Sequence, residues 1–105
     1  NVKGKTCIIV DDIIDSGGTI INAVDALKKN GATEVYVFIT HAVLSGDAAN
    51  KIKKSKIKKL IITDTIDNSQ KIKNNNKIEV LSISSLMAEA IKRISNSTSV
   101  SDLFN

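Results

Sequence analysis

Several residue types that constrain, pack or cross-link a small protein are scarce in this chain. Proline and tryptophan are absent, and there is one cysteine, Cys7. A single cysteine cannot form a disulfide within the chain, so we expect a reducing compartment, with the cytoplasm as the simplest one. The longest apolar runs are about five residues, such as 35–39, whereas a bilayer-spanning helix needs ~20. We therefore expect no membrane partner.

Length and composition are those of an ordinary globular domain. The chain has 105 residues, of which 42% are hydrophobic and 25% charged. These values differ from those of disordered, collagen-like and low-complexity chains. Neither a solenoid-type repeat nor an internal boundary is visible, so residues 1–105 are predicted to form a single domain.

Positive charge is the compositional bias that most needs an interpretation. The formal net charge is +4, and six lysines fall within residues 51–59. These lysines are compatible with a nucleic-acid-binding surface. However, aromatic residues make up only 3% of the chain, and no helix-turn-helix, zinc-finger or ribonucleoprotein motif accompanies the lysines. We interpret the run as a solvated helix face with its following turn, and expect no nucleic-acid partner.

Short β-branched runs alternate with amphipathic helical patterns along the chain. Strands are predicted over residues 5–11, 34–40, 59–63 and 78–83. Helices are predicted after Gly17 and Gly18 with Gly31 as the C-terminal stop, over 46–54 with Ser45 as the cap, and over 85–95. The last helix has an apolar face that consists of Leu86, Met87, Ala90, Ile91 and Ile94. This alternation predicts an α/β fold with a parallel sheet that is covered by helices on both sides.

The turn after the first predicted strand has the residues of a phosphate cradle. In a parallel sheet, ligands bind outside the carboxyl ends of the strands. Gly17 and Gly18 let backbone N–H groups approach a phosphate without a Cβ clash, and Ser16 and Thr19 can add hydroxyl donors. The helix that follows places its N-terminus behind them, which favours an anion.

Three carboxylates accompany this cradle. Asp11 and Asp12, at the mouth of the predicted strand, are suited to the vicinal hydroxyls of a sugar or to Mg²⁺. Asp15 would repel a bound phosphate unless it points outward or toward a metal. The loop has neither the Gly-Lys-Ser/Thr ending of a Walker loop nor the G-x-G-x-x-G dinucleotide fingerprint. A helix-capping turn is the plain structural alternative, but the combination of ten residues favours a ribose-phosphate loop.

Several motifs in order resemble the ribose-phosphate diphosphokinase family, also called phosphoribosyl pyrophosphate synthetases. The loop matches the pattern D-D-x-x-D-[ST]-G-G-T. The resemblance spans the whole chain, through residues 1–4, 10–19, 40–46, 63–66, 86–94 and 99–104. The chain departs from the family pattern at Ser16, Ala42, Asp47 and residues 64–67. Ser16 keeps the hydroxyl, so only the turn geometry near Ala42 and Asp67 is affected.

The resemblance implies a type I phosphoribosyltransferase-like fold and transfer of diphosphate from Mg-ATP to ribose 5-phosphate, which yields phosphoribosyl diphosphate and AMP. Members of that family are about three times as long, and this chain resembles their carboxyl-terminal third. The amino-terminal part would carry most of the ATP site. We therefore expect a ribose-5-phosphate-binding portion that is inactive alone, exposes an apolar surface, self-associates or is poorly soluble, and belongs to a homo-oligomer when complete.

The resemblance also assigns residues to roles. The 5-phosphate would be bound by Asp15, Ser16, Gly17, Gly18 and Thr19, while Asp11 and Asp12 would bind the ribose hydroxyls and help to place Mg²⁺. A second anion site, for phosphate or ADP as effectors, would involve Ser99, Val100, Ser101 and Phe104 in the carboxyl-terminal tail. A frayed terminus is the plain alternative for that tail.

Three other functions stay open. A type I phosphoribosyltransferase would share the loop, although residues 40–46 and 99–104 resemble the synthetases more. A non-catalytic synthetase-associated regulatory subunit would keep the same carboxyl-terminal half. A receiver-type phosphoacceptor would also use paired aspartates, but it would need an aspartate and a lysine at later strand ends, which here carry Thr40, His41 and Thr63.

For a few residues, a structural role is the more common interpretation. His41 is expected to be a hydrogen-bonded structural residue, and Cys7 and Met87 are expected in the core. Thr63 and Thr65 follow the third strand and are expected to stabilise a turn at least as readily as to contact a substrate.

Overall fold

The computed structural model describes residues 1–95, which form four strands and three helices. In chain order these are β1 (Thr6–Ile14), α1 (Gly18–Lys29), β2 (Glu34–Ala42), α2 (Ala48–Lys54), β3 (Lys59–Thr63), β4 (Ile78–Leu81) and α3 (Ile83–Ser95). The strands form one sheet in the order β1-β2-β3-β4, and each neighbouring pair is parallel. The predicted α/β class with a parallel sheet is confirmed.

Strand and helix boundaries differ from the predictions at several ends. β1 continues through the aspartate pair to Ile14, because residues 13 and 14 still pair with residues 41 and 42 of β2. The second helix begins at Ala48 and not at residue 46, with Asp47 as its N-cap residue. Ser45 does not cap that helix through its side chain; its carbonyl accepts the Ala48 N–H at 3.2 Å. β4 ends at Leu81, which is earlier than predicted, and α3 begins at Ile83.

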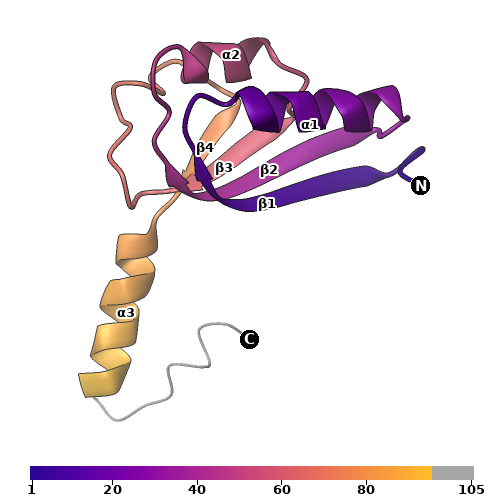
Figure 1. Ribbon diagram of the computed structural model, residues 1–105. Coiled ribbons are helices and arrows are strands. Elements are labelled where there is room, and N and C mark those ends of the chain that lie inside the picture. The colour runs from indigo at the N-terminus through magenta and orange to yellow at the C-terminus, as the bar shows by residue number, and fades with distance from the viewer. Residues whose placement is uncertain (96–105) are drawn as a thin grey trace.

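The hydrophobic core lies between the sheet and the two helices α1 and α2, which cover the same face (Figure 1). Alternate residues of each strand point toward this layer, as the two-residue period of a strand requires. The largest fully buried side chains include Val35 and Val37 of β2, Leu60 and Ile62 of β3, and Ile52 of α2. Cys7 is half-buried and packs against this cluster, so the prediction that it is a core thiol is confirmed in part.

The opposite face of the sheet has no helix over it among residues 1–95, which corrects the prediction of cover on both sides. The exposed fractions are 76% for Val10, 61% for Ile8 and 42% for Phe38. Since α1 and α2 both lie on the other side, these apolar residues face solvent. The expected exposed apolar surface is therefore confirmed in the described part of the chain, while self-association stays a prediction.

Helix α3 extends away from the sheet instead of packing on it (Figure 1). Met87, Ile91 and Ile94 of its apolar face are 55%, 62% and 68% exposed. The prediction of Met87 as a core residue is wrong, because the amphipathic pattern indicates which face prefers burial but not whether a partner is present. No helix within residues 1–95 has the length and apolar character required to cross a membrane.

Candidate functional site

The loop between β1 and α1 forms a shallow hollow at the carboxyl end of β1. A cavity of about 300 Å³ is lined by residues that include Asp11, Asp15 and the run 16–19. Gly17 is the N-cap residue of α1 and has φ +86°, in the left-handed region where a side chain is strained. A glycine at this position therefore has a conformational reason, independent of any ligand.

Donors in this hollow have no partner within the described chain. No residue among 1–95 accepts a hydrogen bond from the backbone N–H groups of residues 16–19, or from the Ser16 and Thr19 hydroxyls. The first N–H groups of a helix have no intrahelical acceptor, and together with the helix dipole they favour an anion. A Cβ built on Gly18 meets no atom within 4 Å, so the hollow is open directly above that residue. The loop thus presents several N–H donors and two hydroxyls at one place.

Residues 43–45 support the loop through backbone hydrogen bonds. The Ile14 carbonyl accepts the N–H groups of Val43 and Leu44 at 2.9 and 3.3 Å, and the Asp15 carbonyl accepts the Ser45 N–H at 3.0 Å. These hydrogen bonds orient the Ile14 and Asp15 carbonyls toward residues 43–45. This arrangement leaves the N–H groups of residues 16–19 for a ligand.

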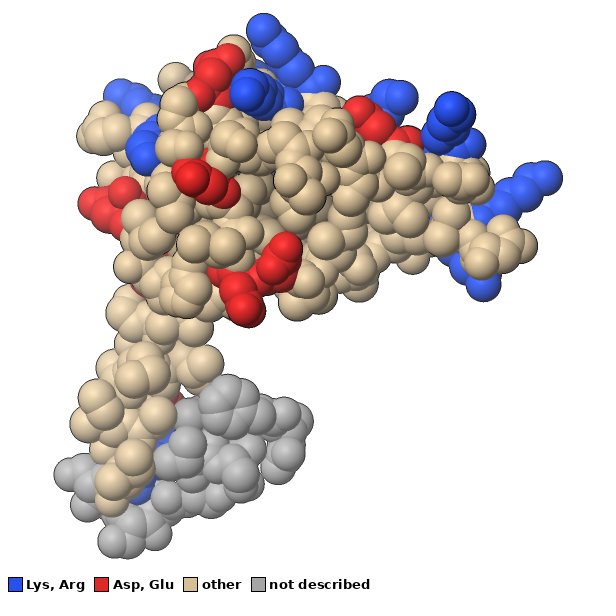
Figure 2. All heavy atoms as spheres, in the orientation of Figure 1, with Lys and Arg blue, Asp and Glu red and all other residues tan. Residues whose placement is uncertain are grey.

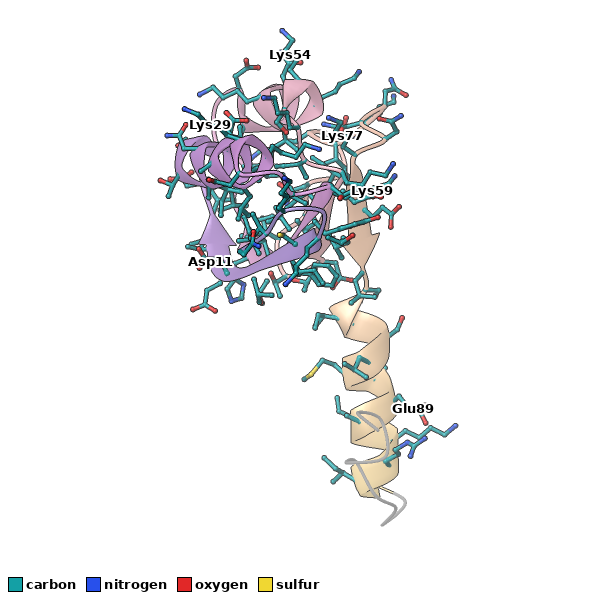
Figure 3. The ribbon with its side chains drawn as sticks, turned by 90° about the vertical axis from the view of Figure 1, so that its right-hand side faces the viewer. Asp11, Lys29, Lys54, Lys59, Lys77 and Glu89 are labelled. Atoms are coloured by element: carbon teal, nitrogen blue, oxygen red, sulfur yellow. The ribbon has the colours of Figure 1, made fainter. Side chains whose placement is uncertain are left out.

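Asp11 and Asp12 lie inside β1, not after it, and both are exposed. The strand pairing runs from Asp11↔Ile39 to Ile13↔His41, and the Asp12 N–H donates to Asp11 Oδ1 at 2.7 Å. Both Ile39 and Ala42 of β2 are buried although they are three positions apart, so the side of the strand that is buried changes here. The two exposed carboxylates lie beside this irregular strand end, at the rim of the sheet. Figure 3 shows Asp11 far from the labelled lysines of the helix layer.

Lysines lie at both ends of the sheet. A groove at the amino ends of the strands is lined by five lysines, among them Lys56, Lys58 and Lys77. Figure 2 shows further lysines over the helix layer and toward the end where the strands finish, where most acidic side chains in view also lie. Lys51 and Lys54 line a second hollow that shares Gly18 with the candidate site, but no lysine is among the residues that line the candidate hollow itself.

Polar residues at the ends of β2 and β3 form hydrogen bonds with one another. The Thr63 and Thr65 hydroxyls both donate to the Thr40 carbonyl, the latter at 3.1 Å, and a hydrogen bond of 3.0 Å joins Thr65 Oγ1 to His41 Nδ1. The structural interpretations of His41, Thr63 and Thr65 agree with these contacts. Their network closes the turn after β3 against the end of β2.

Two residues that follow β3 had no role predicted from the sequence. Asn68 is 4% exposed, and its Nδ2 donates to the Ala42 carbonyl at 2.7 Å, while its Oδ1 has no partner among the described residues. The Asp64 carboxylate accepts the Ile83 N–H at 2.7 Å and the Ser82 and Ser84 hydroxyls at 2.9 and 2.8 Å. These bonds, the Ser84 hydroxyl first, lower the pKa of Asp64. Asp64 thus caps the start of α3 from a distant loop.

The donor set at the rim fits Mg²⁺ in its chemistry. Two exposed carboxylates supply hard oxygen ligands, and Mg²⁺ commonly binds through one or two carboxylates while it keeps waters and substrate oxygens. Within residues 1–95 no cluster of three or more His, Cys, Asp or Glu side chains could hold a metal alone. Asp11 and Asp12 would therefore share the ion with a bound phosphate compound.

The structure places most of the predicted substrate residues around one hollow. Asp11 and residues 15–19 line it, whereas Asp12 follows Asp11 in β1 and is not among the lining residues. Ser99, Val100, Ser101 and Phe104 lie outside the described residues, so their assignment stays a prediction.

Comparison with known sequences finds similarity along the whole chain. The family model described as phosphoribosyl synthetase-associated domain matches residues 1–105. The chain is 49% identical over 105 residues to ribose-phosphate pyrophosphokinase of Vibrio parahaemolyticus serotype O3:K6, covering 100% of this chain and 33% of that one. It is 52% identical over 104 residues to ribose-phosphate pyrophosphokinase of Mesorhizobium japonicum, covering 99% and 33%. The chain therefore spans about a third of the length of the curated relatives it matches.

A solved structure is similar to the described fold. The crystal structure of phosphoribosylpyrophosphate synthetase from Mycobacterium smegmatis aligns with a TM-score of 0.81 at 40% sequence identity. The alignment covers 91% of this chain and 32% of that chain.

Proposed function

The chain belongs to the phosphoribosyl synthetase-associated domain family, and from that premise we propose that it is the ribose-5-phosphate-binding portion of a ribose-phosphate diphosphokinase. That enzyme transfers the β,γ-diphosphoryl group of ATP to the 1-hydroxyl of ribose 5-phosphate, with phosphoribosyl diphosphate and AMP as products. Identity to relatives named ribose-phosphate pyrophosphokinase across the full 105 residues supports this assignment.

One observation carries the proposal most directly. The unpartnered N–H groups of residues 16–19 lie in the same hollow as Asp11, and Asp12 follows Asp11 at the same end of β1. A phosphorylated sugar presents an anion at one end and vicinal hydroxyls further along, so it needs donors and acceptors side by side. The hollow and the rim provide this pair of features.

Each group in the site has a separate task. The N–H groups and hydroxyls of Ser16, Gly17, Gly18 and Thr19 bind the 5-phosphate, while Asp11 and Asp12 accept hydrogen bonds from the ribose hydroxyls. Asp15 is exposed, so its carboxylate can turn away from the phosphate while its backbone stays braced by Ser45. Diphosphoryl transfer depends on positioning and on charge neutralisation, so fixing the acceptor sugar itself contributes to the rate.

Asp11 and Asp12 are also the residues that would help to hold Mg²⁺. The ion would supply positive charge to the transferring diphosphate. The same two carboxylates orient the sugar, and their exposure at the rim leaves them accessible to a second substrate from outside this domain.

Residues 1–105 would be the carboxyl-terminal portion of a longer enzyme, in which most of the ATP site lies outside this chain. The chain alone therefore binds ribose 5-phosphate weakly and does not turn over. In the complete enzyme, a cytoplasmic homo-oligomer, the tail with Ser99, Val100, Ser101 and Phe104 binds phosphate or ADP as effectors. Ser99→Ala with Ser101→Ala would then weaken the effector response and leave ribose 5-phosphate affinity unchanged.

Isothermal titration calorimetry with ribose 5-phosphate tests the site. Asp12→Ala removes a hydroxyl acceptor, and Gly18→Val puts a side chain where the backbone donors must meet the phosphate, so each substitution is expected to abolish measurable binding. A Cβ at Gly18 meets no atom within 4 Å in the folded chain, so the new side chain starts in open space above the hollow.

The matched control is Ala26→Val, which enlarges an exposed residue of the same helix away from the hollow. It is expected to bind as the unchanged chain does. Equal affinity of the Gly18→Val and Ala26→Val chains would refute the assigned cradle. AMP formation by the purified chain, free of contaminating enzyme, would refute its dependence on the missing part.

A further inference from the structure

The hydrogen-bond ladder between β2 and β3 ends before β2 itself does. Its last pair is Ile39↔Ile62, whereas β2 continues to Ala42. Backbone carbonyls beyond the end of a ladder need other donors, because a buried carbonyl without a partner costs free energy. Side chains that follow β3 provide these donors. Two threonine hydroxyls donate to the Thr40 carbonyl, and longer side chains donate to the carbonyls of Ala42 and Val43.

Asn68 and Lys71 are the two residues with these longer side chains. Asn68 Nδ2 donates to the Ala42 carbonyl at 2.7 Å, and Lys71 Nζ donates to the Val43 carbonyl at 2.9 Å. Both come from the loop between β3 and β4, which lies beside the connection from β2 to α2 (Figure 1). Two successive residues of that connection are therefore held by side chains 26 and 28 positions further along the chain.

The backbone of Asn68 is itself held in place. Its carbonyl accepts the Ile72 N–H at 3.0 Å, and Ile72 packs against the core cluster. Asn68 Nδ2 also lies 3.4 Å from the Ile66 carbonyl, so two carbonyl acceptors surround this end of the amide and identify it as the donor end. The bond to Ala42 is therefore made by a buried side chain whose position is already fixed.

Each of these bonds reaches the phosphate loop through one peptide group. The Ala42 carbonyl and the Val43 N–H belong to the same planar group, and that N–H donates to the Ile14 carbonyl at 2.9 Å. The Val43 carbonyl and the Leu44 N–H form the next group, and this N–H donates to the same Ile14 carbonyl at 3.3 Å. Two rigid groups thus connect the side chains of Asn68 and Lys71 to the residue that ends β1.

Leu44 shows that the conformation of this connection does not follow from local preference. It has φ +52°, in the left-handed region that non-glycine residues rarely adopt, and it is 1% exposed. Such a backbone conformation persists where the surroundings fix it. The bonds from Lys71 on one side and to Ile14 and Asp15 on the other provide that constraint.

We propose that Asn68 and Lys71 are positioning residues for the phosphate loop. Neither side chain lines the hollow. They orient two peptide groups that hold the Ile14 carbonyl, and this carbonyl sets where the N–H groups of residues 16–19 begin. The inference rests on the proposed function, in which those N–H groups bind a phosphate.

Asn75 provides a matched contrast within the same loop. Its Nδ2 donates to the Ala49 carbonyl at 2.9 Å, and its Oδ1 accepts the Lys77 N–H at 3.2 Å. Ala49 lies in α2, and within residues 1–95 its backbone makes no hydrogen bond to residues 14–19. A buried or half-buried asparagine amide on a backbone carbonyl is thus common to both residues, whereas the connection to the phosphate loop is found only for Asn68.

Amide NMR spectra of the 105-residue chain, with inorganic phosphate as the probe, test the proposal. Asn68→Leu keeps a side chain of similar size and removes the donor together with the unpartnered Oδ1, so the fold is expected to survive. Without phosphate, the amide resonances of residues 16–19 are expected to shift. The dissociation constant for phosphate is expected to rise about fivefold, as for the loss of one hydrogen bond.

The controls separate positioning from stability. Asn75→Leu removes two hydrogen bonds, so it is expected to lower the Tm at least as much as Asn68→Leu but to leave phosphate affinity unchanged. Lys71→Met is expected to raise the dissociation constant about twofold, since its ammonium group is exposed. Lys73→Met is its control, because Lys73 is exposed and makes no hydrogen bond within residues 1–95.

Unmoved resonances of residues 16–19 in Asn68→Leu would overturn the proposal, as would an unchanged phosphate affinity or an equal loss of affinity in Asn75→Leu. If Asn68→Leu does not fold, equal affinities of Lys71→Met and Lys73→Met would overturn it. Absence of phosphate binding by the unchanged chain would instead refute the proposed function. The resonances without phosphate would then still decide whether Asn68 sets the conformation of the loop.

Discussion

The two faces of the sheet use the same strands and similar residues, yet their environments are opposite. On the helix side, Val35, Val37 and Leu60 are fully buried under α1 and α2. On the other side, Val10 and Phe38 occupy alternate positions of the same strands and remain exposed. Apolar residues on both faces show that each face is suited to burial, whereas the described chain covers only one. Within residues 1–95, therefore, one face of the sheet is packed and the other is not.

The largest expected effect is a difference in stability loss between two leucine substitutions, one at a buried and one at an exposed position. Leu60 in β3 is fully buried, and Leu81 in β4 is 61% exposed. Leu60→Ala should lower the free energy of unfolding by about 2–5 kcal/mol, since it removes buried methyl groups and leaves a cavity. Leu81→Ala should change it by less than about 0.5 kcal/mol in the 105-residue chain. Urea unfolding monitored by circular dichroism measures both.

The same pair sharpens the comparison in a longer chain. In a chimera in which this chain replaces the matched third of the Vibrio parahaemolyticus protein, Leu81→Ala should become clearly destabilising, because further polypeptide is then available to cover this face. A cost for Leu81→Ala that is already as large as that of Leu60→Ala in the 105-residue chain would show that the two faces do not differ in solution.

A smaller effect separates the two glycines of the loop. Gly17 has φ +86°, so Gly17→Ala should destabilise the chain by about 1–2 kcal/mol through backbone strain. Gly18 begins α1 without a positive φ and with free space for a Cβ, so Gly18→Ala should be neutral or slightly stabilising. Thermal unfolding of the two variants checks this order. A destabilising Gly18→Ala would mean that Gly18 has a folding role and is a poor probe of phosphate binding.

The smallest effect concerns the attachment of α3, the element outside both layers. Hydrogen bonds from Ser84, Ile83 and Ser82 lower the pKa of Asp64, so its stabilising contribution is present above the unfolded pKa and is lost as the pH falls through the lower folded pKa. The helicity of α3 should therefore decrease in acid below about pH 4. Amide exchange at Ile83 as a function of pH measures this loss.

Asp64→Asn should weaken the cap at neutral pH and remove its acid dependence. Asp67→Asn is the matched control, because the pKa of Asp67 is also lowered, by the Ser69 N–H, but its bond lies within its own turn. If both variants retain the same pH dependence at Ile83 as the unchanged chain, the Asp64 cap does not hold α3.

Much of the local structure was predictable from residue patterns. The third strand was predicted over the residues that form β3, and the loop with Gly17 and Gly18 was placed correctly between strand and helix. These features depend on β-branched runs, glycine and helix periodicity, which act over a few neighbouring residues. The end of β1 was less predictable, because Asp11 and Asp12 resemble a loop although the pairing of residues 13 and 14 with β2 extends the strand through them.

Other features depend on contacts between distant residues. Asn68 meets the Ala42 carbonyl, and Asp64 meets the start of α3, across loops whose polar composition has no period to indicate a partner. Met87 fits a core pattern, but its helix has no surface to pack on within residues 1–95. A sequence pattern reports which side of an element prefers burial, and it is silent about which other element provides that burial.

By itself, then, the sequence determined the alternation of strands and helices, the parallel sheet, and the glycine loop between β1 and α1 with its neighbouring carboxylates. Only the tertiary structure decided that α1 and α2 share one face, that β1 lies at an edge, that residues 43–45 brace the loop, and that Asp64 caps α3. The physical reason is the range of the interactions. Propensity, glycine φ and helix N-termini act locally along the chain, whereas sheet order, face coverage and the partners of buried polar groups depend on residues far apart in sequence.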